Sequence, residues 1–146
     1  MKNIKPRDAL KHPKWKMGKK ITIDSASMVN KILEYIEAQK LFKIPKEKLD
    51  IIIHPESLVH AILELKNGLV KLLYHETSMI IPLANAMFNG KLNIEHFNLK
   101  KKTGIQISNL NFQSPNKSNF PILKIKNRAN EYPSTPIIIN AANEIL

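Results

Sequence analysis

Residues 24–40 constrain the fold more than any other stretch, because their apolar side chains recur with the period of an α-helix. At about 100° per residue, these side chains fall on one arc: Met28, Val29, Ile32, Leu33 and Ile36. Polar side chains occupy the opposite arc: Ser27, Asn30, Lys31, Glu34 and Glu37. Asp24 or Ser25 can cap the first turn. The pattern predicts an amphipathic helix that buries one face and presents the other.

The rest of the chain alternates short strand and helix patterns. Strands are predicted for five apolar or alternating runs: Ile21–Ile23, Leu49–Ile53, Leu58–Leu65, Leu69–Tyr74 and Ile105–Phe112. Asn67-Gly68 joins the third and fourth runs as a hairpin. Helices are predicted for Ser78–Phe88, capped by Thr77 or Ser78, for Pro121–Asn130, and for a segment opened by Asn140. This order favours an α+β fold, with a mixed or antiparallel sheet and helices packed on one face.

Composition limits the class of protein. The 146 residues suffice for one domain, and a hydrophobic content of 43% is typical of a globular protein. The chain has no cysteine, which excludes disulfides and thiolate metal sites. No apolar run is long enough to span a bilayer, and residues 1–15 lack the apolar core of a secretory signal. We therefore expect a cytoplasmic location and no membrane partner.

The net charge of +11 comes almost entirely from lysine, since Arg7 and Arg128 are the only arginines. Aromatic residues make up 6% of the chain. Proteins that read base edges favour arginine, and single-strand binders interleave aromatic side chains with basic ones. We therefore expect no nucleic-acid partner. A lysine-rich nucleic-acid-binding module is the alternative class, and it would show binding that weakens steeply with salt.

The polar arc of the predicted helix is a candidate site for an anion and a hard cation. Ser25 and Ser27 are predicted at the helix N-terminus, where free N–H groups favour an anion. Lys31 adds a positive charge, Asn30 can donate and accept hydrogen bonds, and Glu34 could bind a divalent cation. The alternative is a solvated face with an ordinary Lys31–Glu34 ion pair. The spacing by itself favours the solvated face.

Two other segments carry candidate functional side chains. In residues 12–18, His12, Trp15 and Met17 could belong to a lid that closes over an anionic ligand. Alternatively, Trp15 docks the N-terminal segment onto the core. His54 follows a predicted buried strand, where an active-site base is often found, although a histidine there is more commonly structural. The histidines, His60 among them, show no HExxH or other metal-ligand spacing.

Three stretches together resemble one family. HPKWKMGKKITIDSASMVNKILEYIEAQKLF (residues 12–42) resembles the pattern HPxWxMGxKIxxDSAxxxNKxxExIEAxxLF of the 1-deoxy-D-xylulose 5-phosphate reductoisomerase family. IIIHPESLVHAILELKNG (residues 51–68) resembles that family's HPxSxVHxxVxxxDG segment. NAANEI (residues 140–145) resembles the stretch that opens its next helix. The match spans most of the chain.

The resemblance implies an enzyme of non-mevalonate isoprenoid biosynthesis, acting on a small phosphorylated sugar. This family isomerises 1-deoxy-D-xylulose 5-phosphate and reduces the product with NADPH to 2-C-methyl-D-erythritol 4-phosphate. The resemblance also implies a divalent metal (Mg2+, Mn2+ or Co2+) that chelates the substrate oxygens, and a homodimer. In this interpretation residues 1–146 form a partial catalytic domain, without the family's NADPH-binding and C-terminal helical domains, and are inactive by themselves.

Matching positions carry the family's residue roles onto this sequence. The resemblance assigns substrate binding, chiefly around the phosphate, to four residues: His12, Ser25, Asn30 and Lys31. It assigns metal ligation and contact with the substrate hydroxyls to Glu34, the expected catalytic residue. Gly18 would contact the nicotinamide nucleotide, and Trp15 and Met17 would form the lid. His60 matches a histidine near the family's site.

The sequence also departs from the family pattern. Ile32 stands where a glycine is usual, and TSMIIP (residues 77–82) stands where PDMRxP is common, which weakens any assignment at residues 75–80. The family's Asp-Ser-Glu segment, which supplies two further metal carboxylates, is absent. Glu34 by itself is therefore expected to bind a divalent cation poorly. A third alternative is a unit that serves only for dimerisation, through edge strands of the hairpin.

Overall fold

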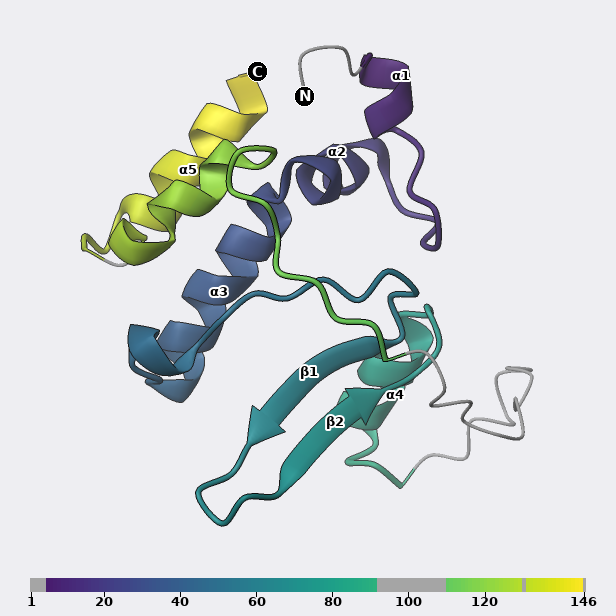
Figure 1. Cartoon of the computed structure of the whole chain (residues 1–146). Coiled ribbons are helices and arrows are strands. Elements are labelled where there is room, and N and C mark those ends of the chain that lie inside the picture. The colour runs from purple at the N-terminus through teal and green to yellow at the C-terminus, as the bar shows by residue number, and fades with distance from the viewer. Residues whose placement is uncertain (1–4, 92–109, 130, 146) are drawn as a thin grey trace. The chain divides into compact units, whose positions relative to one another are not determined.

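The structure is a computed structural model in which residues 5–91, 110–129 and 131–145 are described. Contacts divide the chain into two compact units, residues 1–53 with 113–146 and residues 54–112. The first unit contains α1 (Pro6–Ala9), α2 (Lys19–Ser27), α3 (Val29–Phe42), the short 3-10 helices η1 (Lys46–Lys48) and η4 (Pro121–Arg128), and α5 (Thr135–Ile145) (Figure 1). The second contains β1 (Val59–Glu64), β2 (Val70–Tyr74) and α4 (Ile80–Met87).

The predicted amphipathic helix is divided at Met28, which adopts a left-handed conformation with φ 67° between α2 and α3. The strand predicted at Ile21–Ile23 is wrong, because these residues lie in α2. The Thr22 hydroxyl donates to the Gly18 carbonyl at 2.8 Å, one helical turn back, and both Thr22 and Asp24 are buried. Tertiary contacts on this side of α2 therefore override the β propensity of the local sequence.

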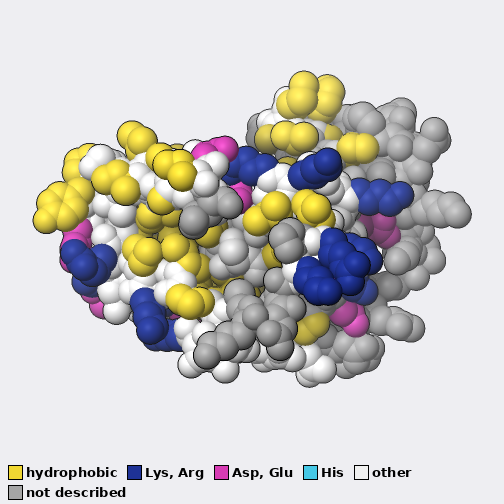
Figure 2. All heavy atoms as spheres, turned by 90° about the horizontal axis from the view of Figure 1, so that it is seen from above, with side chains coloured by type: hydrophobic (Ala, Val, Ile, Leu, Met, Phe, Trp, Pro, Cys, Tyr) yellow, Lys and Arg dark blue, Asp and Glu magenta, His cyan; other side chains and the backbone are white. Residues whose placement is uncertain are grey.

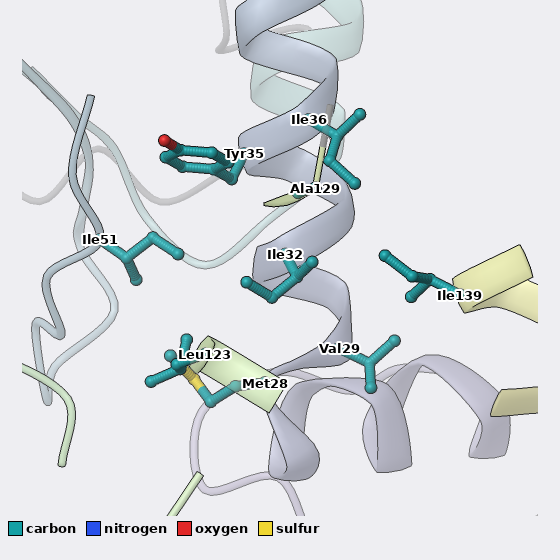
Figure 3. Packing of buried hydrophobic residues seen from close by; sticks show 9 residues of the cluster. All are labelled: Met28, Val29, Ile32, Tyr35, Ile36, Ile51, Leu123, Ala129 and Ile139. Atoms are coloured by element: carbon teal, nitrogen blue, oxygen red, sulfur yellow. The ribbon is translucent and has the colours of Figure 1, made fainter. Parts of the chain in front are cut away.

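The apolar arc of α3 forms the core of the first unit, as predicted (Figure 3). The buried cluster consists of Met28, Val29, Ile32, Tyr35, Ile36, Ile51, Leu123, Ala129 and Ile139, with Leu33 packed against it. Ile32 and Ile36 are the largest fully buried side chains. Tyr35, which the sequence analysis did not place in the core, is 3% exposed, and its hydroxyl donates to the Lys46 carbonyl at 3.3 Å.

The second unit contains the predicted antiparallel hairpin. Strands β1 and β2 pair in the register Ile62 to Leu72, with an irregularity between Val59 and Ala61. Gly68 lies in the turn with φ 84°, a conformation that favours glycine. Helix α4 is confirmed as well, but its N-cap is Met79, without a side-chain hydrogen bond, so the predicted capping by Thr77 or Ser78 is wrong.

Several boundaries in the remaining segments differ from prediction. Residues 49–53 form no regular strand; Ile53 instead makes an isolated antiparallel bridge with Gln113, with N–O distances of 2.8 and 2.9 Å. The helix predicted at Pro121–Asn130 is the 3-10 helix η4, and α5 begins at Thr135 rather than at Asn140. Most of the strand predicted at Ile105–Phe112 lies outside the described residues.

The α+β class and the antiparallel sheet are confirmed. Many large hydrophobic side chains nevertheless remain exposed, and Figure 2 shows such side chains gathered on the face it presents. On α3 and α5 they include Leu41, Phe42, Ile137, Ile138 and Ile145. Within the part of the chain that the structure describes, no helix has the length and hydropathy required to cross a membrane.

Candidate functional site

The first turns of α3 bring together the three polar side chains that the helical spacing predicts on one face. The Asn30 side-chain amide donates to Glu34 Oε1 at 2.5 Å, and Lys31 Nζ donates to Glu34 Oε2 at 2.7 Å. Lys31 and Glu34 are 45% and 47% exposed. We call Asn30, Lys31 and Glu34 the Glu34 cluster.

The Glu34 cluster contributes little to stability, because exposed ion pairs at this spacing are worth only a few tenths of a kcal/mol. Its chemistry is more distinctive. An amide that can donate, a fixed positive charge and a carboxylate converge within hydrogen-bonding distance on a solvent-accessible face. Such a set can bind a phosphorylated ligand through Asn30 and Lys31, and one cation through Glu34.

Ser25 and Ser27 do not lie at a helix N-terminus, so the prediction that a helix begins at these residues is wrong. Both belong to the last turns of α2, and the Ser27 hydroxyl donates to the Asp24 carbonyl at 3.2 Å. The N-terminus that follows belongs to α3, whose N-cap Met28 makes no side-chain capping hydrogen bond. Asn30 and Lys31 occupy that first turn, so the positive end of the helix dipole lies at the Glu34 cluster instead.

The predicted lid residues lie in the segment that leads into α2. His12 Nδ1 accepts the backbone N–H groups of Lys14 at 3.2 Å and Trp15 at 2.9 Å. Trp15 and Met17 are half-buried. Gly18 is the N-cap of α2, and a Cβ placed on it would meet nothing within 4 Å. The packing of the described chain therefore does not require a glycine at this position.

Acidification is expected to disturb the His12 turn. Burial lowers the pKa of His12 below its ordinary value of 6.5. Because the folded-state pKa is the lower one, the neutral ring contributes stability above pH 6.5, and this contribution is lost as the pH falls through the folded pKa. Trp15 is the single tryptophan of the chain, so its fluorescence emission should change with a midpoint below pH 6.5. His12→Asn should abolish this transition and His75→Asn should leave it unchanged; a midpoint above the ordinary histidine pKa would contradict the account.

The second unit contains the other candidate histidines. His54 Nδ1 accepts the backbone N–H groups of Leu58 and Val59, both at 3.1 Å, and thereby shapes the turn before β1. This geometry supports the structural interpretation of His54. The His60 ring stacks on His75 with a centroid distance of 3.7 Å, and His60 Nε2 lies 3.1 Å from the His75 carbonyl oxygen. The stacking of His60 on His75 was not predicted, because it depends on the register in which β1 and β2 pair and not on a local sequence pattern.

Asp24 is the most important residue that the sequence analysis left without a role beyond capping. Its side chain is buried and accepts hydrogen bonds from Lys20 and, across 119 positions of sequence, from Asn143. Among the described residues, no three His, Cys, Asp or Glu side chains are gathered as a metal site would need. Glu34 is thus the one carboxylate that the Glu34 cluster offers.

Comparison with protein families places the chain among reductoisomerase C-terminal domains. A family model described as the 1-deoxy-D-xylulose 5-phosphate reductoisomerase C-terminal domain matches residues 1–42. A second, described as the DXP reductoisomerase C-terminal domain, matches residues 75–146. The chain belongs to the 1-deoxy-D-xylulose 5-phosphate reductoisomerase family.

Curated relatives and solved structures agree with this assignment. The reductoisomerases of Pelagibacter ubique and Prosthecochloris aestuarii are 47% and 42% identical to the chain over 99% of its length. The chain spans only 37% and 38% of those two proteins. The Zymomonas mobilis enzyme in complex with NADPH superposes with a TM-score of 0.77 at 31% identity, covering 97% of this chain and 36% of that one. A reductoisomerase in complex with NADPH, fosmidomycin and magnesium gives 0.80 at 34% identity, covering 99% and 35%.

Proposed function

We propose that this chain supplies the substrate-binding face of an NADPH-dependent enzyme that converts 1-deoxy-D-xylulose 5-phosphate to 2-C-methyl-D-erythritol 4-phosphate. The observation that carries the proposal is the Glu34 cluster, in which Asn30 and Lys31 both reach the Glu34 carboxylate from one exposed helix face. Family membership supports the choice of reaction, since the relatives carry that enzyme's name. Residues 1–146 then form a partial catalytic domain, and the NADPH-binding and C-terminal helical domains lie outside them.

In this proposal the side chains of the chain bind and orient the substrate. Lys31 provides the positive charge for the phosphate, and Asn30 donates a hydrogen bond to it. Ser25 and His12 contribute further polar contacts around the phosphate. Trp15 and Met17 cover the bound sugar and exclude water, which strengthens the electrostatic interactions inside the site. Glu34 contacts the substrate hydroxyls.

A divalent metal and NADPH fit the chain only in part. Mg2+ is commonly bound through one or two carboxylates together with substrate oxygens and water, and Glu34 fits as one such ligand. When bound, the metal would act as a Lewis acid on the substrate oxygens. The open space at Gly18 suits the close approach of a nicotinamide nucleotide, because a Cβ there would meet nothing within 4 Å. Further metal ligands are expected outside these residues.

The proposal predicts activity only when these residues are joined to the rest of the enzyme. With 1-deoxy-D-xylulose 5-phosphate and Mn2+, the complete enzyme that contains residues 1–146 should oxidise NADPH, as followed by absorbance. The 146-residue chain should show no turnover, because the Glu34 cluster offers a metal one carboxylate and the sequence has no glycine-rich nucleotide loop. Absence of substrate-dependent NADPH oxidation in the complete enzyme would contradict the proposed function. Turnover by the 146-residue chain would contradict the proposal that further segments are needed for activity.

We also propose a cytoplasmic homodimer that binds neither nucleic acid nor membranes. Within the described residues both strands of the hairpin are edge strands, and Leu63, Leu72 and Leu73 on them are exposed. Edge strands with apolar side chains favour pairing with another chain. Sedimentation velocity of the enzyme at several concentrations tests this, and a monomer throughout would count against it.

A further inference from the structure

A buried carboxylate ties α2 to α5 next to the proposed site. Asp24 in α2 is 4% exposed. Its Oδ2 accepts a hydrogen bond from Lys20 Nζ at 2.7 Å, and its Oδ1 accepts one from the Asn143 side-chain amide at 2.6 Å. Lys20 Nζ also lies 3.2 Å from Glu144 Oε1. Lys20 Nζ donates to Asn140 Oδ1 at 3.5 Å as well. Both oxygens of the buried carboxylate are therefore engaged, and the three partner groups from α5 are Asn140, Asn143 and Glu144.

The tie acts beside the junction of α2 and α3, two helices that also pack directly against each other. Helices α2 and α3 meet at Met28, whose left-handed conformation is unfavourable for a non-glycine residue, and α3 has no side-chain cap. An element that contacts both helices therefore adds to the direct packing that sets the angle between them. Helix α5 does so, because Asn143 contacts α2 through Asp24, while Ile139 packs with Val29 of α3 in the buried cluster (Figure 3).

We propose that Asp24, with Lys20 and Asn143, forms a positioning network that fixes α2 against α5 and thereby places Ser25 and the Glu34 cluster for substrate binding. The proposal rests on the proposed function, in which the Glu34 cluster binds the phosphorylated substrate. Asp24 precedes Ser25 directly and lies six residues before Asn30. Gly18 is the N-cap of the same helix, α2, so the network also fixes the end of the lid segment.

The charges of the network suit neutral pH. The hydrogen bond to Asp24 is the largest cause that raises the pKa of Lys20 above its ordinary value of 10.5, and the ion pair with Glu144 adds to it. Because the folded-state pKa is the higher one, the contribution of Lys20 to stability is complete below pH 10.5 and is lost as the pH rises through the folded pKa. Removal of Asn143 takes away a donor to the buried carboxylate together with its contact to α5, so it should let α2 shift.

The test uses the 146-residue chain, inorganic phosphate as the probe, and nuclear magnetic resonance of the Asn30 and Lys31 amides. Asn143→Ala should move these resonances in the free chain and weaken phosphate binding about tenfold. This is the lower end of the loss found when a group that orients a binding residue is removed. The exchange Asp24→Asn with Asn143→Asp keeps both hydrogen bonds, because the amide introduced at position 24 can accept from Lys20 and donate to position 143. It should restore both the resonances and the affinity.

A matched control separates positioning by Asp24 from the general effect of weakening a polar contact in the same unit. Asp50→Asn weakens the ion pair of Asp50 with Lys126, which ties η4 to the segment after η1 and does not involve α2. The Asn30 and Lys31 resonances should not move, and the unfolding midpoint should change little, because the Asp50 side chain is 77% exposed. Unchanged resonances in Asn143→Ala, or a folded exchange variant that fails to restore them, would overturn the positioning role. If Asn143→Ala does not fold, the exchange variant decides alone. Failure of the unsubstituted chain to bind phosphate would count against the proposed function. The positioning role would still be tested, because the Asn30 and Lys31 resonances report it without phosphate.

Discussion

Replacement of Glu34 by glutamine is expected to lower kcat/KM of the complete enzyme by at least about a hundredfold. Loss of a group that only supports a metal ligand already lowers metal affinity or activity by about 10–100-fold, and Glu34 is expected to be a ligand itself. The substitution keeps the size of the side chain and its ability to accept from Asn30, but removes the negative charge that a divalent cation requires. Steady-state NADPH oxidation at several Mn2+ concentrations measures the loss, which should be only partly recovered by more metal.

Glu37→Gln is the matched control for Glu34. Glu37 lies on the same helix and is exposed, three positions further on, but it lies outside the Glu34 cluster. Its replacement should change kcat/KM by less than about twofold, since surface substitutions away from a site have small effects. Equal losses in the two variants would contradict the assignment of Glu34. Unfolding midpoints should barely differ, because the Lys31–Glu34 pair is half-exposed.

Ile32→Ala is expected to destabilise the chain by about 2–5 kcal/mol, the usual range for truncation of a buried isoleucine. Ile32 is 0% exposed and lies at the centre of the cluster formed by α3, η4 and α5. Urea denaturation followed by circular dichroism measures the free energy of unfolding. A cost of this size is a large part of the stability of an ordinary domain. A variant that is partly unfolded at 25 °C would therefore also agree with the prediction.

Ile137→Ala serves as the comparison for Ile32→Ala. The Ile137 side chain on α5 is 71% exposed, so its truncation should change the free energy of unfolding by less than about 0.5 kcal/mol. Similar costs for the two variants would show that the cluster around Ile32 is not the core. The result for position 32 also bears on the family pattern. A glycine is usual there in the family, and Ile32→Gly is expected to leave a cavity in this chain.

The sequence predicted the elements whose signals are local and periodic. The apolar arc of α3 follows from residues repeated every three or four positions, and Ile32 and Ile36 are indeed fully buried. The hairpin follows from Asn67-Gly68, because Gly68 adopts the positive φ that the turn requires. The convergence of Asn30, Lys31 and Glu34 follows from the same helical spacing.

Other features depend on contacts between distant parts of the chain. A left-handed Met28 has no local signature, so one continuous helix was the natural prediction, and the position of Ser25 was wrong with it. Residues 21–23 have β-branched side chains, yet they are helical because Thr22 and Asp24 face inward and Asp24 meets Asn143, far along the sequence. The roles of the site residues came from resemblance to a family, since the spacing by itself favours a solvated helix face. Those roles remain predictions.

A crystal structure of the complete enzyme with Mn2+ and 1-deoxy-D-xylulose 5-phosphate would show whether Glu34 binds the metal and whether Asn30 and Lys31 bind the phosphate. We expect an anomalous manganese peak in contact with a Glu34 carboxylate oxygen, and the substrate phosphate within hydrogen-bonding distance of Asn30 and Lys31. Manganese and phosphate bound elsewhere, with the Glu34 cluster still facing solvent, would contradict it.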